Sequence, residues 1–140
     1  QVLSEHILQH NKDVKTNKQP NTSLNKKELN SIRKIAEKIS NNVAEDYNVE
    51  DLAVLLGLPQ AKLQEGFKIL FSRTVIEYIR HVRLEEARDL INTCDYNISQ
   101  IVYSIGFSSR SYFSKIFKKK YGISPSKLLK NKQKTTIKIS

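Results

Sequence analysis

Two groups of mostly polar side chains, about 50 residues apart, have the chemistry needed to hydrogen-bond to the edges of nucleic-acid bases. Arginine and lysine suit guanine, glutamine suits adenine, and serine can pair with either base. Lys118 and Lys119, at the end of the second group, suit phosphate oxygens better. The first group comprises Gln60, Ala61, Lys62, Gln64, Glu65 and Lys68, and the second comprises Ser109, Arg110, Ser111, Ser114, Lys115, Lys118 and Lys119.

For any one of these residues, a solvated helix face is the simpler interpretation. Taken together they carry more weight, because both groups lie in copies of one repeated pattern. Residues 49–58 and 98–107 keep apolar residues at matching positions, and each run ends in a glycine followed by a large apolar side chain. The match resumes at an offset of 50, where Leu63, Phe67 and Phe71 correspond to Phe113, Phe117 and Tyr121.

This spacing of four residues predicts a core-facing stripe on a helix, with the polar group on the outer face. Each copy is therefore expected to be a short helix, a tight turn and a longer helix. Gly57 and Gly106 stand at the turns, where positive φ is least costly for glycine. A short helix, turn and exposed second helix form the helix-turn-helix arrangement, in which the second helix enters the major groove of DNA.

The other segments also indicate helices, so the predicted fold class is all-α. Apolar residues at helical spacing predict a helix over 26–42, and Asn48 and Asn97 are placed to cap the first helix of each repeat. Thr74 and Glu77 form a capping box that opens a long helix to about residue 92, with Ile76 among its expected buried residues. A last, short helix is expected to start at 124–126.

The net charge of +10 is unevenly placed along the chain. Residues 96–140 contain ten lysines and arginines and no acidic residue, whereas the 14 basic and 14 acidic residues before them balance. A basic surface attracts polyanions, nucleic acid first among them. The second repeat is therefore expected to supply most of the affinity for DNA.

Catalytic and cofactor chemistry have little support in the sequence. The lone Cys94 allows no internal disulfide or tetrahedral zinc site, and the histidines His6, His10 and His81 are scattered. We expect no enzyme activity, metal or cofactor. No apolar run approaches the roughly 18 residues of a membrane span, so no membrane partner is expected, and a reducing, cytoplasmic setting fits best.

The expected layout has three parts. Residues 1–24 are predicted to be the end of an upstream helix and a linker, 25–132 the double helix-turn-helix DNA-binding domain, and 133–140 a frayed basic tail. Because the chain contains no methionine, we interpret it as part of a longer protein.

Residues 98–125 resemble the signature of AraC/XylS-type transcription regulators, through Gly106-Phe107, Ser111-Tyr112-Phe113 and the run 121–125 (Tyr-Gly-Ile-Ser-Pro). Residues 78–80 and 83–88 also match that family. The resemblance implies a seven-helix domain in which a long connecting helix joins two helix-turn-helix units that bind successive major-groove segments. It places base contacts at Ala61, Gln64 and Glu65 in the first unit, and at Arg110, Ser111, Ser114 and Lys115 in the second.

Three positions depart from the commoner family pattern, all in the first unit. Glu65 stands where a basic residue is frequent, Gly66 costs a helix about 1 kcal/mol, and Ser72 replaces the glycine seen at Gly122. The first unit is therefore expected to contribute less than the second.

The leading hypothesis is a bacterial, sequence-specific transcription regulator, most often an activator that meets RNA polymerase, with an upstream effector-binding or dimerisation domain outside this chain. The alternative is a non-specific nucleic-acid-binding or architectural protein held by lysines alone. The two differ in sequence dependence, since only a specific reader prefers one duplex about 10³-fold or more.

Overall fold

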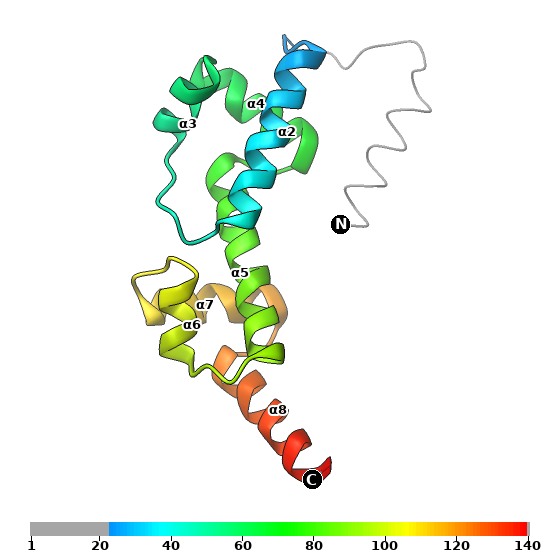
Figure 1. Ribbon diagram of the computed structural model, residues 1–140, viewed down its shortest axis with the longest axis vertical. Coiled ribbons are helices and arrows are strands. Elements are labelled where there is room, and N and C mark those ends of the chain that lie inside the picture. Colours follow the sequence, from blue (N-terminus) through cyan, green and yellow to red (C-terminus); the bar gives the residue numbers. More distant parts are fainter. Residues whose placement is uncertain (1–22, 140) are drawn as a thin grey trace, which may run out of the picture. The chain divides into compact units, whose positions relative to one another are not determined.

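The structure is a computed structural model that describes residues 23–139 (Figure 1). These residues form helices joined by turns, with no strand among them, which confirms the all-α prediction. The seven helices are α2 (Lys26–Asn41), α3 (Val49–Leu56), α4 (Gln60–Phe71), α5 (Val75–Thr93), α6 (Ile98–Ser104), α7 (Arg110–Tyr121) and α8 (Pro125–Ile139). The expected upstream helix end and linker at 1–24 lie outside the described residues, apart from Ser23 and Leu24.

The chain divides into two compact units, which are described separately. The first comprises Gln1–Asn41 and Tyr47–Ile79, and its described part holds α2, α3, α4 and the start of α5. Helix α2 packs against α4. The apolar side chains that the two helices bury between them, together with α3, include Ile32, Ile35, Ile39, Leu52, Leu63, Phe67 and Leu70.

Gly66 explains how α4 comes so close to α2. A Cβ atom at this position would collide with the Ile32 side chain, which is fully buried. The helix-weakening glycine noted in the sequence is therefore a packing feature, since it allows the close approach of the two helices.

The second unit comprises Asn42–Asp46 and Arg80–Ser140, with most of α5 and helices α6, α7 and α8. Arg83 of α5 fixes the 42–46 segment: its Nε donates to Val43 O at 2.8 Å, and its Nη2 donates to Glu45 O at 2.9 Å. The buried apolar side chains of this unit include Leu84, Ala87, Ile91, Ile98, Ile101, Ile105, Phe113 and Phe117.

The predicted helix starts are confirmed. Asn48 Oδ1 accepts from Asp51 N at 2.8 Å, and Asn97 forms a capping box with Gln100 at the start of α6. At the start of α5, Thr74 N donates to Glu77 Oε1 at 2.8 Å while Glu77 N donates to Thr74 Oγ1 at 3.2 Å. From there α5 runs without a break to Thr93, close to the predicted end at about 92.

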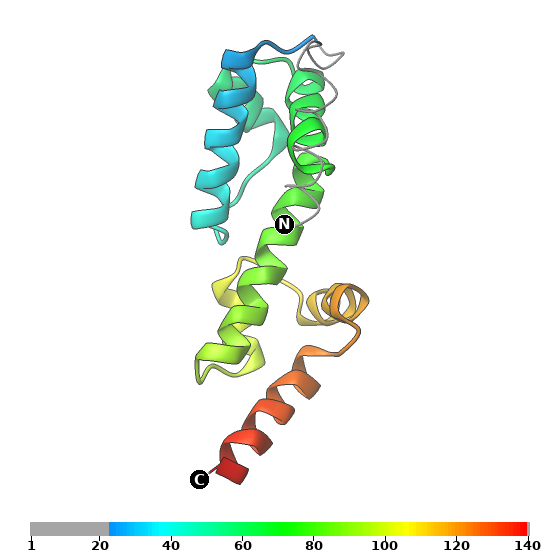
Figure 2. The ribbon, with the colours of Figure 1, turned by 90° about the vertical axis from the view of Figure 1, so that its right-hand side faces the viewer.

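Two expectations need correction. Ile76 is 49% exposed, because the buried stripe of α5 runs through Val75, Ile79 and Val82, and Ile76 is turned about 100° from Val75. Helix α8 is longer than the predicted short helix, and continues to Ile139 through most of the segment expected to be frayed (Figure 2). Residues 126–139 contain no glycine or proline that would end the helix.

Candidate nucleic-acid interface

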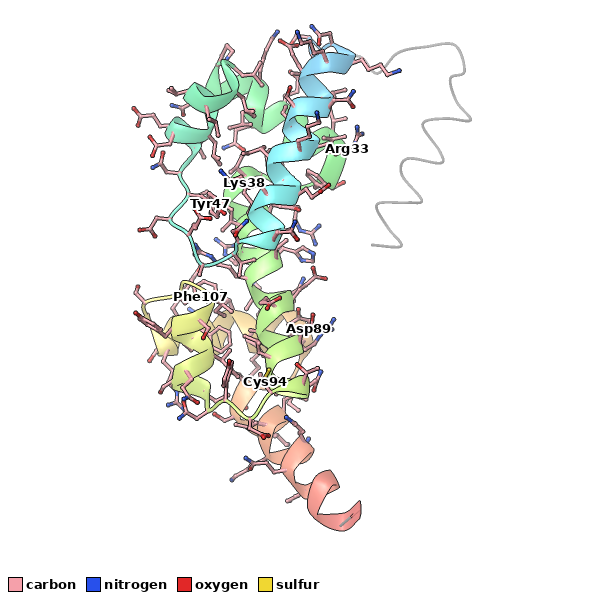
Figure 3. All side chains as sticks on the ribbon, viewed as in Figure 1. Arg33, Lys38, Tyr47, Asp89, Cys94 and Phe107 are labelled. Atoms are coloured by element: carbon pink, nitrogen blue, oxygen red, sulfur yellow. The ribbon has the colours of Figure 1, made fainter. Side chains whose placement is uncertain are left out.

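The turns before α4 and α7 share one backbone pattern, as the repeat predicts. The turn glycines have φ of +67° and +87°. Leu58 N donates to Ala53 O at 3.0 Å, and Phe107 N donates to Val102 O at 3.2 Å, between positions that correspond in the two repeats. Phe107, labelled in Figure 3, also contacts Phe113 of α7, with ring centroids 5.7 Å apart. The two turns therefore share the backbone around the glycine, while the second turn is one residue longer and ends in a serine cap where the first ends in Pro59.

The first turn of α4 is partly neutralised by α2. Gln60 and Ala61 are exposed, but Lys62 Nζ lies 3.4 Å from Glu28 Oε2. The Asn25 backbone N–H, and then the Lys62 ammonium, hold the pKa of Glu28 below its ordinary value. The Glu28 carboxylate therefore stays ionised and keeps Lys62 paired.

Further along α4, the charged candidates also have intramolecular partners. Ser23 Oγ donates to Glu65 Oε1 at 3.0 Å, which ties the half-buried carboxylate to the segment before α2. Lys68 Nζ lies 3.9 Å from Glu77 Oε1, and both side chains are well exposed, so this ion pair is weak. The face of α4 thus carries little uncompensated positive charge.

Gln64 is the candidate that the structure places least as expected. Its Oε1 accepts from Val75 N at 2.9 Å, in a partly buried contact between α4 and the first residue of α5. The side chain is half-buried, so it does not extend freely from the outer face.

On α7, the candidates at the helix start have local roles. Ser109 is the N-cap, with its Oγ accepting from Tyr112 N at 3.1 Å. Arg110 Nη1 donates to Ser99 Oγ of α6 at 3.1 Å. The side chains of Arg110 and Ser99 are both exposed, so a competing acceptor can replace Ser99 at small cost.

The rest of the α7 face is unengaged. Ser111 is exposed and Ser114 is half-buried. Lys115, Lys118 and Lys119 are exposed and make no hydrogen bond or ion pair with the residues that the structure describes. With no acidic residue between 96 and 140, α7 presents uncompensated positive charge, in contrast to α4.

Lys120, in the same basic run, behaves differently. Its Nζ lies 2.7 Å from His81 Nδ1, and His81 Nε2 lies 3.3 Å from Glu85 Oε1. This chain of contacts directs Lys120 toward α5. All three lysines of the run 118–120 are exposed, but only Lys120 has a hydrogen-bond partner among the described residues. His81 belongs to this network on α5.

Two residues with a role at these faces were not among the predicted site residues. Ser99 holds Arg110, and its place two residues after the capping Asn97 could have indicated an exposed hydroxyl in the first turn. Glu28 pairs with Lys62 only because α2 packs against α4, and no local pattern in the sequence indicates that contact.

Among the described residues, no group of three or more histidine, cysteine, aspartate or glutamate side chains is arranged to hold a metal ion. No helix in that part of the chain is long and apolar enough to cross a membrane.

Comparisons with known proteins agree with this architecture. A family model described as a helix-turn-helix domain matches residues 52–131. The histidine kinase P4 of Formosa agariphila is 36% identical over 96 residues, which are 68% of this chain and 7% of that protein. The transcriptional activator RhaS of Mannheimia succiniciproducens is 33% identical over 90 residues, 64% of this chain and 34% of that protein. The chain thus spans a minor part of the length of these two relatives.

A solved structure shows the same fold. It is a transcriptional regulator from Chromobacterium violaceum with an AraC-type DNA-binding domain, which matches with a TM-score of 0.68 and 24% identity. The match covers 77% of this chain and 96% of that one.

Proposed function

The chain belongs to the AraC-type helix-turn-helix family of sequence-specific DNA-binding transcription regulators, and on this premise we propose that it reads two adjacent major-groove segments, one with α4 and one with α7. The observation that carries this proposal is the α7 face. There, Lys115, Lys118 and Lys119 follow Arg110 and have no partner among the described residues. The core side of the same helix is filled by buried Phe113 and Phe117.

Within α7 we assign different tasks to different positions. Arg110 and Lys115 suit guanine, and Ser111 and Ser114 suit short contacts to base edges. Lys118 and Lys119, further along the helix, suit phosphates and set the register of the domain on the duplex.

The two units contribute unequally in this proposal. Lys62 and Lys68 have acidic partners within the first unit, so DNA competes with Glu28 for Lys62 and, more weakly, with Glu77 for Lys68. Lys115, Lys118 and Lys119 of α7 have no such partner among the described residues, and each releases counterions from the duplex when it binds. We therefore assign most of the affinity to α7, and a smaller, sequence-dependent contribution to α4, chiefly through exposed Gln60 and Ala61.

The setting of the whole protein is part of the same proposal, and the likeness to the family supports it. We propose a bacterial regulator that acts on DNA in the cytoplasm, contacts RNA polymerase as an activator and has no catalytic activity in this domain. The likeness to the activator RhaS supports activation. The signal would enter through a further domain, since the chain matches only part of the length of its relatives.

Selection of duplexes from a random pool at near-physiological salt tests the proposal. We expect enrichment of one motif with two parts about 10 base pairs apart, because that spacing is one helical turn of DNA. Binding without enrichment would instead support the non-specific, lysine-driven alternative.

A further inference from the structure

We infer that Gln64 positions the first reading helix instead of reading a base. The inference rests on the proposed function, in which α4 is a reading helix. Its basis is the hydrogen bond from Val75 N to Gln64 Oε1, 2.9 Å long and partly buried, which joins the middle of α4 to the first residue of α5.

The start of α5 requires this acceptor. The first backbone N–H groups of a helix have no partner within the helix. The Thr74–Glu77 capping box satisfies the N–H groups of those two residues, which leaves those of Val75 and Ile76, and only Ile76 is exposed to solvent. The Val75 residue is fully buried, so an unpaired N–H here would carry a desolvation cost that Gln64 removes.

The corresponding position in the second unit has no backbone N–H donor. At the repeat offset of 50, Gln64 corresponds to Ser114 and Val75 corresponds to Pro125. Proline has no backbone N–H and suits the first position of a helix, so α8 needs no acceptor from α7 at this point. In agreement, Ser114 makes no hydrogen bond with the described residues, and Pro125 is as fully buried as Val75.

The bond changes what Gln64 can offer to DNA. A glutamine that specifies adenine uses its carbonyl oxygen and its amide nitrogen together, against N6 and N7 of the base. The bond to Val75 N holds Oε1 in a partly buried contact beside α5, so the side chain cannot present its oxygen and nitrogen together to a base unless this bond breaks. The side chain instead fixes α4 relative to the start of α5, and so places Ala61 and the other residues on the α4 face.

Three variants separate positioning from reading. Gln64→Ala removes the acceptor. Gln64→Glu keeps an acceptor at a helix N-terminus, where negative charge is favourable, but cannot pair with adenine in the manner of an amide. Val75→Pro removes the donor in the way the second unit does. Each variant is tested for its melting temperature, and for binding, well below that temperature, to the selected duplex and to all single base-pair changes within it.

If Gln64 is a positioning residue, Gln64→Ala lowers the Tm by about 3–5 °C, the effect of losing about one net hydrogen bond in a domain of this size. It also weakens binding roughly 2–10-fold and flattens base preference along the whole α4 segment, with the α7 segment unchanged. Gln64→Glu keeps the Tm of the wild type, and also keeps the base preference across the whole segment that α4 reads. In the Val75→Pro background, Gln64→Ala no longer lowers the Tm.

The inference is overturned if Gln64→Ala leaves the Tm unchanged, or if it abolishes preference at a single base pair while the rest of the α4 segment is read normally. It is also overturned if Gln64→Glu shows that same single-position loss. Failure of the proposed function looks different, because wild-type protein would then show no base preference in either segment. In that case the Tm values and the uniform change in affinity decide whether Gln64 holds α4.

Discussion

Gly66 of α4 lies against the side chain of Ile32 of α2, at a place where no Cβ atom fits. Since Ile32 is fully buried, the atoms around it leave little room for adjustment. The packing of the first unit therefore depends on the absence of one methyl group.

Gly66→Ala is expected to destabilise the protein by about 1 kcal/mol. Overpacking costs about 1–3 kcal/mol, while the better helix propensity of alanine returns about 1 kcal/mol. Thermal unfolding measures the net effect. Ile32→Val removes the Cδ1 methyl that meets the new Cβ, so Ile32→Val in the Gly66→Ala background should recover part of the loss. A higher Tm for Gly66→Ala alone would contradict the argument, because it would show that α2 and α4 accommodate the added methyl group without loss of stability.

Ser72 is the one non-glycine residue with positive φ among those described, at +58°. Left-handed backbone costs a non-glycine residue roughly 1–2 kcal/mol, so Ser72→Gly is expected to raise stability by about 1 kcal/mol. The matched control is Gly122→Ser at the corresponding helix end, where φ is +75°. Thermal unfolding should show opposite shifts for the two variants, and shifts of the same sign would refute the strain argument.

Arg110→Ala is expected to cost roughly 1–3 kcal/mol of binding free energy on the selected duplex and to relax the choice at one base position. Ser99→Ala is the control, because it removes the intramolecular partner of Arg110 without removing the guanidinium. Binding to a panel of single base-pair variants gives the answer. Equal weakening on every duplex would exclude a direct base contact by Arg110.

Lys118→Ala is expected to weaken binding to every duplex alike and to make the log–log salt slope shallower by about one unit, since one phosphate contact is lost. Lys120→Ala is the contrasting variant. Because Lys120 contacts His81 of α5, its loss should change the salt slope less than the loss of Lys118. Titrations at several salt concentrations measure both slopes. An unchanged slope for Lys118→Ala would place this lysine away from the DNA backbone.

Acidification should weaken the contact of α2 with α4. The pKa of Glu28 is lowered in the folded protein, first by the Asn25 backbone N–H and then by Lys62. A lowered folded-state pKa means that the carboxylate stabilises the fold above its ordinary value of 4.5, and that this contribution is lost as pH falls through the lowered value. Glu28→Gln should therefore flatten the acid side of a plot of Tm against pH. Glu37→Gln, an exposed change on the same helix, is the control, and its plot should be steeper on the acid side than that of Glu28→Gln. Identical slopes for the two variants below the ordinary carboxyl pKa would contradict the role of Glu28.

The local signals in the sequence predict most of this fold. Asn48, Asn97 and the Thr74–Glu77 box mark helix starts because each bond is made within a few residues. The repeat correctly places Gly57 and Gly106 at positive φ. The pairing of Gln64 with Val75, and of Lys62 with Glu28, was not predictable in this way, because each bond joins different helices and depends on how those helices pack.

The measurement that tests the central claim most directly is the ratio of two dissociation constants at near-physiological salt. One is measured for the duplex obtained by selection, and the other for a shuffled duplex of the same length and composition. A sequence-specific reader predicts a ratio of about 10³ or more. A ratio near one would contradict that function and leave a domain that binds DNA through its lysines alone.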